Sequence, residues 1–267
     1  MTVRERLFGI RAAGVVFAAV IALAAAGCGD DDADTPEPTD PTAGGETQAL
    51  DIELPPALES SGVIRIGTSF NFPPLNFKND ENEYDGAEPA LMDELGAKLG
   101  LDIERVETNF AGLLPGLEAS RFDIITSGMN DTDERREQVD FVNYLRSGTS
   151  VMVQAGNPEG IQGADDLCGA TVGVAMGTTY VGDLEGFSDE CVAEGREPID
   201  VQTLQSGSEV VQALLTGRIH ATFANHISNL YFVQESEGQL AVVGEPVNPV
   251  YLGIAVPKGD TVLAEAI

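Results

Sequence analysis

Short apolar and polar blocks alternate along the chain from residue 63 onward. A strand-like block over 63–68 is followed by a helical apolar stripe that starts near Pro89 and ends at Gly100. Strands that alternate with helices are typical of parallel sheets with crossover helices, so the chain is predicted to be α/β. The same block continues with a strand over 102–107, a helix over 112–119 and a strand over 122–126.

A second block of the same kind begins near residue 147. After 147–153, its strands are expected over 171–175, 199–203 and 219–224, and its helices over 178–184 and 209–215. Residues 117–127 and 214–224 both contain a helix end, a short turn with arginine and a strand. We therefore expect two similar lobes and a ligand site in the gap between them, where the carboxyl ends of the strands meet.

The N-terminus has the pattern of an export signal. Arginines precede an apolar run over 12–26 that is too short to span a bilayer comfortably. Small residues then lead into Cys28, which resembles the lipobox of bacterial lipoproteins. The resemblance implies a signal peptide over 1–28, lipid on Cys28 and an exported chain held at the outer face of the cell membrane. An ordinary signal peptide with an incidental cysteine is the alternative.

Composition restricts the partners of the protein. The chain of 267 residues carries 14 Lys plus Arg against 44 Asp plus Glu, a net charge of −30, which repels nucleic acid. Such an acidic, lysine-poor exterior is also found in proteins that work at high salt. Residues 29–61 are predicted to be a disordered acidic tether, because most of this stretch is Asp, Thr, Pro, Gly and Glu without apolar periodicity.

Two cysteines remain besides Cys28. In an exported protein Cys168 and Cys191 are expected to form a disulfide rather than a metal site, and no CxxC motif or histidine cluster accompanies them. The sequence therefore predicts neither a metal nor a cofactor.

Four loops that follow strands supply the candidate site. They span 69–72, 127–135, 177–179 and 224–226. The Gly-Thr-Thr turn at 177–179 opens a helix, where free backbone N–H groups and the helix dipole favour an anion such as a carboxylate. Arg135 supplies a planar fork for the same carboxylate. A plain capped helix and a surface arginine are the alternatives.

The order and spacing of several motifs resemble the amino-acid type solute-binding proteins of bacterial ABC importers (solute-binding protein family 3). The resemblance covers about residues 62–267. The motifs are IGT at 66–68 with FPP at 72–74, GLLPGL at 112–117, FDIITSGM at 122–129, DER at 133–135 with VDF at 139–141, GTT at 177–179, GR at 217–218 and LGIAV at 252–256.

The resemblance implies a two-lobed periplasmic-binding-protein fold, type II-like, with two parallel-rich sheets joined by a hinge that the chain crosses twice. Lobe 1 would span 62–146 with 252–267, lobe 2 would span 151–245, and the hinge would be 147–150 and 246–251. A monomer that captures an amino acid or a related carboxylate and delivers it to a membrane permease is expected.

The resemblance also assigns residues to the ligand. Aromatic rings would sandwich it, an arginine would grip its carboxylate, and groups from the 127–130 and 177–179 segments would complete the grip. The expected ligand-binding residues are Phe72, Phe110, Ser127, Gly128, Asn130, Arg135, Thr178, Thr179 and Asn225, with Ser69, Met129 and Met176 in the side-chain pocket.

Two residues depart from the family pattern. The family commonly places an aspartate for the ligand's α-ammonium where this chain has Asn225, and often a serine where it has Asn130. The hypothesis is that the ligand's nitrogen is methylated, displaced or absent, or that Asp131 takes over the ammonium. Ser69 disfavours a strongly basic side chain, because family members that take one often carry an acid there.

Two other functions stay open at this point. The same fold is known to host a cyclohexadienyl dehydratase-like enzyme, but the chain has no GxSxG or HExxH motif, and His226 is interpreted as a hydrogen bonder at the site's edge rather than a base. A ligand-sensing domain of a signalling system is the other alternative. Residues 261–267 begin a helix without a terminal cap, so the chain is expected to be a fragment.

Overall fold

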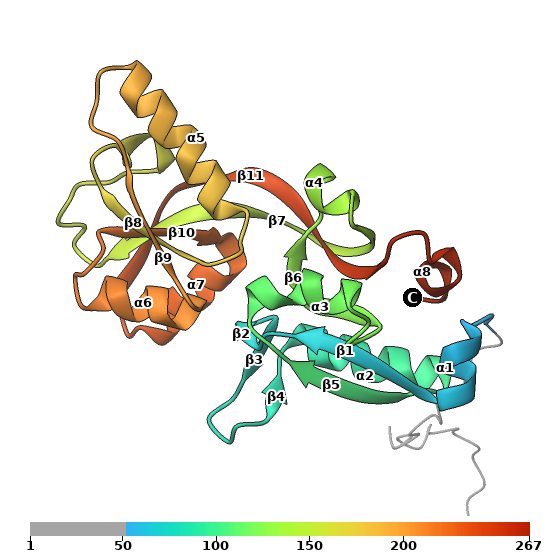
Figure 1. Ribbon diagram of the computed structural model, residues 1–267. Helices are drawn as coiled ribbons and strands as arrows, with labels where there is room; N and C mark the ends of the chain where they lie inside the picture. The colour runs from blue at the N-terminus through green and yellow to red at the C-terminus, as the bar shows by residue number, and fades with distance from the viewer. Residues whose placement is uncertain (1–51) are drawn as a thin grey trace, which may run out of the picture. The chain divides into compact units, whose positions relative to one another are not determined.

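The computed structural model describes residues 52–267 (Figure 1). The predicted signal peptide, the lipidated Cys28 and tether residues 29–51 lie outside the described residues. The end of the predicted tether is wrong, because Pro56–Ser61 forms helix α1. Leu58 of this helix packs into the core of lobe 1, and Gly62 ends the helix in the left-handed conformation, at φ 66°. Burial of Leu58 stabilises this short helix, which the sequence pattern did not indicate because Leu58 is its only buried residue.

Lobe 1 is built on three parallel strands, β1 (Val63–Thr68), β5 (Asp102–Glu107) and β6 (Ile124–Asn130). Helices α2 (Ala87–Leu99) and α3 (Leu113–Glu118) connect them, close to the predicted ranges. The sequence pattern did not predict the small antiparallel sheet of β2 (Asn71–Phe72), β3 (Asn76–Lys78) and β4 (Tyr84–Asp85). Helix α4 (Asp133–Arg136) follows β6 and carries Arg135, as expected from the sequence. Helix α8 (Thr261–Ala266) forms within the predicted 261–267.

Lobe 2 repeats the arrangement. Its strands are β8 (Thr171–Ala175), β9 (Asp200–Leu204) and β10 (Ala221–Asn225), and β8 pairs in parallel with both others. Its helices are α5 (Tyr180–Ala193), α6 (Gly207–Leu215) and α7 (His226–Glu235). Helix α7 was not predicted, and α5 is longer than expected.

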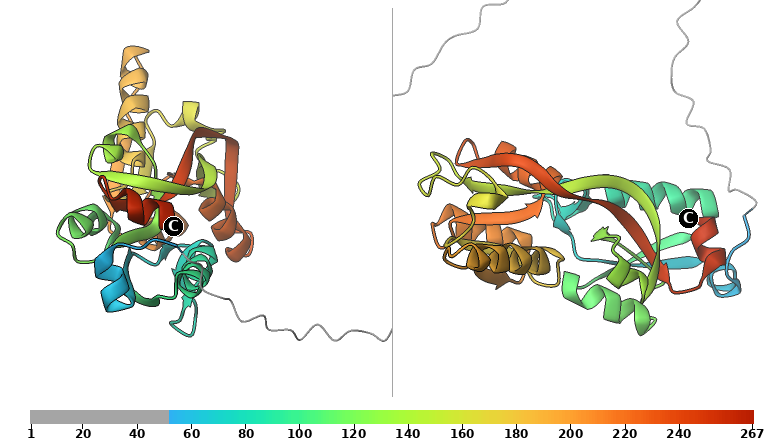
Figure 2. Two further views of the ribbon diagram at one scale, coloured as in Figure 1. Left: turned by 90° about the vertical axis from the view of Figure 1, so that its right-hand side faces the viewer. Right: turned by 90° about the horizontal axis from the view of Figure 1, so that it is seen from above.

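Two long strands connect the lobes. β7 (Val139–Gln154) and β11 (Leu240–Pro257) run antiparallel to each other from one lobe into the other (Figure 2). Because they keep hydrogen-bonding, the two expected sheets are joined into one of eight strands, in the order β5-β1-β6-β11-β7-β10-β8-β9. The β7–β11 register shifts between Val243 and Val250, a stretch that includes most of the predicted hinge segment 246–251.

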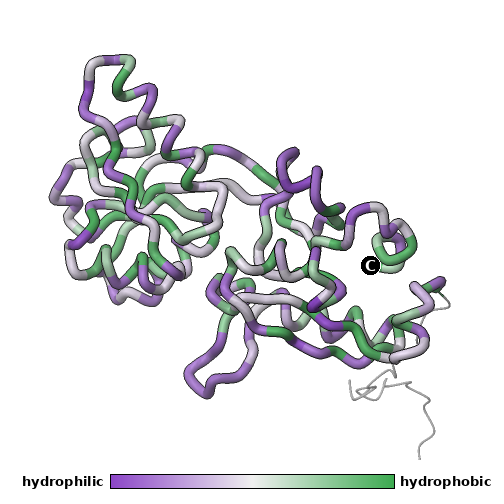
Figure 3. The backbone as a smooth tube through the Cα atoms, in the orientation of Figure 1, coloured by the Kyte–Doolittle hydropathy of each residue, from purple (hydrophilic) through white to green (hydrophobic). Residues whose placement is uncertain are grey.

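Each lobe has its own core. Lobe 1 buries Ile64, Ile66 and Ile124 between its sheet and α2, and lobe 2 buries residues such as Val172, Leu184 and Phe223. Figure 3 shows hydrophobic segments along the central strands of both lobes. No helix within residues 52–267 is both long and apolar enough to cross a membrane.

The structure contains the predicted disulfide between Cys168 and Cys191, whose Cα atoms are 5.7 Å apart. The bond ties the segment before β8 to helix α5, with a sequence separation of 23. Closing a loop of that size stabilises the fold by about 3 kcal/mol on loop-entropy grounds.

Candidate ligand-binding site

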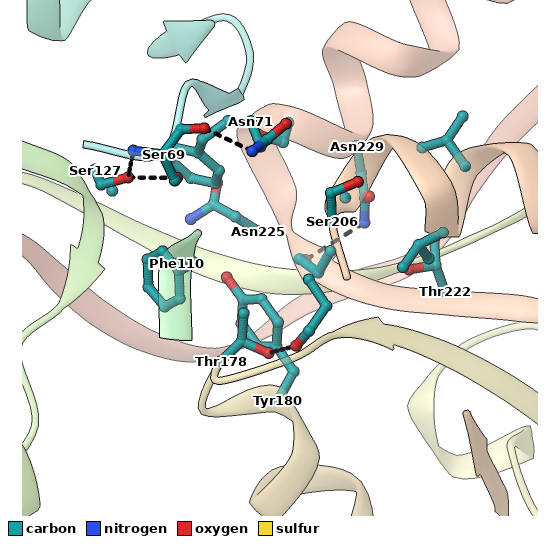
Figure 4. A pocket seen from close by; sticks show the side chains of 18 of the residues that line it. Ser69, Asn71, Phe110, Ser127, Thr178, Tyr180, Ser206, Thr222, Asn225 and Asn229 are labelled. Carbon is teal, nitrogen blue, oxygen red and sulfur yellow. Dashed lines mark hydrogen bonds between the residues drawn. The ribbon is translucent and has the colours of Figure 1, made fainter. Parts of the chain in front are cut away.

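A cavity of about 90 Å³ lies between the two lobes, and side chains from both surround it (Figure 4). That volume suits a small molecule rather than a chain segment. Nine of the predicted residues line it: Ser69, Phe72, Phe110, Ser127, Gly128, Asn130, Arg135, Thr178 and Asn225.

Arg135 is the only ionised side chain that lines the cavity within residues 52–267. It belongs to helix α4 and is 7% exposed. Its Nη1 donates to the Asn130 carbonyl oxygen at 2.9 Å, its Nη2 donates to the Gly177 carbonyl oxygen at 3.2 Å, and the guanidinium carbon lies 5.6 Å from the centre of the Phe110 ring. No ion pair of the described residues includes Arg135. Burial lowers the pKa of Arg135.

The lobes touch beside this arginine. Asn130 Nδ2 donates to Thr179 Oγ1 at 2.8 Å, and Ser228 Oγ donates to the Pro73 carbonyl oxygen at 2.5 Å. Gly177 has φ +79°, and a Cβ added to it would lie 2.9 Å from the Ala111 Cα. A glycine there allows the two backbones to approach closely.

The Gly-Thr-Thr turn is partly engaged by its own lobe. The Thr178 hydroxyl donates to the Ala175 carbonyl oxygen at 2.7 Å, and the Thr178 amide donates to the same oxygen at 3.4 Å. The turn leads into α5, whose N-terminus carries partial positive charge. Arg135 therefore shares its surroundings with a second positive group. Thr179 itself does not line the cavity, and its hydroxyl accepts from Asn130.

Two serines and a phenylalanine form the wall on lobe 1. Ser69 Oγ and Ser127 Oγ are 2.6 Å apart, and the Ser69 amide donates to Ser127 Oγ at 3.1 Å. The Phe72 ring lies against Gly128, so closely that a Cβ at residue 128 would stand 2.3 Å from its Cδ1 atom. Gly128 has φ +59°, in the left-handed region that favours glycine.

Two residues predicted for the side-chain pocket do not line the cavity. Met129 is 1% exposed and packs in the core of lobe 1 instead of lining the cavity. Met176 is 40% exposed and does not line the cavity.

Asp131 is also unavailable to a ligand. It forms an ion pair with Arg136 at 2.5 Å and accepts from Asn143 at 2.8 Å. Burial acts to raise the pKa of Asp131, but the hydrogen bonds from Arg136 and Asn143 outweigh it and hold the pKa below its usual value. Asp131 does not line the cavity, so its geometry gives no support to the idea that it binds an ammonium.

The wall on lobe 2 was largely missed by the sequence analysis. Helices α6 and α7 contribute apolar Val210, Val211 and Phe232, beside the polar Ser228 and Asn229. The sequence analysis considered only loops that follow strands as candidate binding segments, so it did not include the faces of α6 and α7. Tyr180, at the start of α5, was missed too. Burial raises the pKa of Tyr180 to about 12, against the opposing influence of Arg135.

A buried carboxylate lies behind the cavity. Glu88, in the first turn of α2, is 1% exposed. Its oxygens accept from Asn76 Nδ2 at 2.6 Å, from the Gly128 amide at 2.7 Å and from the Tyr144 hydroxyl. Burial raises the pKa of Glu88, and these hydrogen bonds oppose the shift. Glu88 thus fixes the backbone of Gly128 from the side away from the ligand.

A family model described as "Bacterial extracellular solute-binding proteins, family 3" matches residues 64–267. The chain belongs to this family. Among the relatives of this solute-binding protein, the arginine-binding protein ArgT of Corynebacterium glutamicum is 33% identical over 213 residues, 79% of this chain and 69% of the relative. The L-cystine-binding protein TcyJ of Escherichia coli K12 is 30% identical over 79% of this chain and 76% of its own length.

Solved structures confirm the predicted two-lobed α/β fold. An ancestral arginine-binding protein bound to arginine aligns with a TM-score of 0.71 and 31% identity, and covers 77% of this solute-binding protein and 88% of its own chain. The ancestral amino acid-binding protein AncCDT-1, a precursor of cyclohexadienyl dehydratase, aligns with a TM-score of 0.71 and 28% identity over 79% of this chain and 88% of its own.

We predict that Gly128→Ala destabilises the fold by about 1–3 kcal/mol, because alanine is strained at this φ and its Cβ would displace the Phe72 ring. Gly182→Ala is the matched control. It lies inside helix α5 with no atom within 4 Å of an added Cβ, so alanine should stabilise there by about 0.5–1 kcal/mol. Urea unfolding of both variants measures the effects. An unchanged or higher stability of Gly128→Ala would contradict this account of the wall.

A second prediction concerns Glu88→Gln. A folded-state pKa raised above the ordinary 4.5 means that Glu88 favours the fold most at low pH, and that this contribution is lost as pH rises above about 4.5 through the raised pKa. The stability of the wild type relative to Glu88→Gln should therefore fall from pH 4.5 to pH 8. Urea unfolding across that range tests it, with Glu94→Gln, on an exposed part of the same helix, as the control. Parallel pH profiles for the wild type and Glu88→Gln would refute it.

Proposed function

We propose that this solute-binding protein captures an amino acid or an amino-acid-like carboxylate between its lobes and delivers it to an ABC permease. The observation that supports the proposal most directly is the buried Arg135, which lines the cavity without a carboxylate partner among residues 52–267. A buried cation is costly unless an anion pairs with it. A carboxylate that accepts from the free N–H groups of Arg135 provides that anion.

Capture works through closure of the lobes. Lobe 1 (62–146 with 252–267) supplies Arg135, lobe 2 (151–245) supplies the Gly177 turn, and residues 147–150 and 246–251 of β7 and β11 serve as the hinge. A ligand held by both lobes lowers the free energy of the closed form relative to the open form. The hydrogen bonds of Arg135, Asn130 and Ser228 across the gap favour the same closed arrangement. The permease then recognises the closed protein.

Binding rather than catalysis is the proposed activity. Within residues 52–267 neither a carboxylate nor a histidine lines the cavity, so the usual groups for moving a proton to or from a solute are missing from its wall. His226, considered as a base in the sequence, is not among the lining residues. The relatives ArgT and TcyJ are binding proteins.

Export and anchoring complete the proposal. The family consists of extracellular proteins, and the lipobox-like segment before Cys28 supports attachment of a monomer to the outer face of the membrane through lipid on that cysteine. The anchor would keep the solute-binding lobes near the permease, with residues 29–51 as the spacer.

Arg135→Gln should weaken solute binding by about 100-fold, because it removes a charge-assisted pair worth about 3 kcal/mol. The exposed Arg218→Gln is the control and should bind as the wild type does. Calorimetry with a panel of 2-amino, 2-hydroxy and 2-oxo acids that carry the side chains of leucine, phenylalanine and glutamine measures the loss. Undiminished affinity in Arg135→Gln would count against the carboxylate grip.

Cys28→Ser should release the exported protein from the membrane. In cells that produce the full chain, the wild type is expected in the membrane fraction and should incorporate a radioactive fatty acid. The variant is expected outside the membrane fraction and without the fatty-acid label. Fractionation with immunoblotting provides the measurement. Fatty-acid label on the variant would disprove anchoring through this residue.

A further inference from the structure

Asn225 carries an unused hydrogen-bond donor in the wall of the cavity. It is the last residue of β10, is 1% exposed and is the N-cap of α7. Its Oδ1 accepts from the Ile227 amide at 3.0 Å and from Ser147 Oγ at 3.1 Å. Its Nδ2 has no partner among residues 52–267. Figure 4 shows Asn225 among the side chains that surround the cavity.

The orientation of this amide is fixed by the helix that it caps. A backbone N–H can only donate, so the atom that faces Ile227 must be the oxygen. Turning the amide over would place Nδ2 against the Ile227 amide and lose the cap. The nitrogen is therefore the atom left over, and a buried donor without an acceptor is costly.

The rest of the wall gives no counter-charge for a cation. Arg135 is positive, and the N-terminus of α5 beside it is partly positive. No carboxylate lines the cavity within residues 52–267. Asp131, next to the lining Asn130, is engaged with Arg136, and Glu88, behind the lining Gly128, is engaged with Asn76, Tyr144 and the Gly128 amide. An ammonium group placed here would meet a guanidinium and an amide donor, without a carboxylate.

A second buried amide in the wall, that of Asn130, also has an atom without a partner, but it supplies no negative charge for a cation. Asn130 Oδ1 is buried without a partner, and Asn130 Nδ2 bonds to a hydroxyl that can donate or accept. Asn130 can therefore present either its oxygen or its nitrogen to a solute, whereas Asn225 presents only its nitrogen. Of the two amides, Asn225 is therefore the one that distinguishes a solute with a hydrogen-bond acceptor from a solute with an ammonium group.

We propose that the solute is a carboxylic acid whose α-carbon bears a hydrogen-bond acceptor, a keto or hydroxyl oxygen, in place of a free ammonium. Its carboxylate pairs with Arg135, and its α-oxygen accepts from Asn225 Nδ2. The inference rests on the proposed function, since it presumes that the cavity holds an organic carboxylate.

The acid panel used for Arg135 tests the inference on the wild type and on Asn225→Asp. The aspartate can still cap α7 with one oxygen, and it places a second, negative oxygen where Nδ2 was. Wild type is expected to bind a 2-oxo or 2-hydroxy acid at least tenfold more tightly than the 2-amino acid with the same side chain. Asn225→Asp is expected to reverse this order, with at least a tenfold gain for the amino acid.

Asn82→Asp controls for added charge, because residue 82 is exposed at φ 63°, a conformation that aspartate tolerates. It should leave the ranking unchanged. Tighter binding of the amino acid by the wild type would overturn the inference even if Asn225→Asp did not fold, and it would leave the carboxylate grip intact. Failure of every acid to bind the wild type would overturn the proposed function together with the inference.

Discussion

The site depends on one buried charge that the protein leaves uncompensated. Arg135 is held by two backbone carbonyl oxygens and the face of Phe110, which satisfy part of its N–H groups but supply no negative charge. One of those carbonyls belongs to the opposite lobe. The arginine therefore links the two lobes, and the carboxylate of the proposed function would supply the missing negative charge. This coupling is what a capture protein needs, because an empty closed form is less stable than a filled one.

The continuous β7–β11 ladder fits the proposed motion of the lobes, because each lobe has a core of its own. Lobe 1 and lobe 2 bury separate apolar clusters, so a rotation between them disturbs neither. The two crossing strands form the proposed hinge, and their pairing is irregular between Val243 and Val250. The contacts between the lobes include hydrogen bonds such as Asn130 to Thr179, each worth about 1 kcal/mol, and the Phe77 and Tyr231 rings, whose centroids are 5.8 Å apart. A ligand can therefore decide the balance.

The sequence predicted the main strands and most lining residues of the loops, but it did not predict which side chains of helices and strand interiors face the cavity. The bounds of β1, β5 and β8 agree with the periodicity, because a buried strand leaves a strong pattern. Arg135 and Asn225 were selected by their place after strands. Helix α7 lacks a clear apolar stripe and was missed. Met129 was wrongly assigned because the facing of one residue in β6 depends on register, and Glu88 was missed because only tertiary packing buries it beneath Gly128.

The acidic exterior and the positive cavity act at different ranges. A net charge of −30 repels an anionic solute from a distance, but salt near 0.1 M screens exposed charges beyond about 10 Å. Within the cavity, burial removes water and strengthens the attraction of Arg135. Surface charge therefore affects how fast a solute arrives, whereas in the proposed site the arginine and the amide of Asn225 would decide which solute stays. An acidic protein can for this reason still select an acid, because the selecting groups lie where salt does not reach.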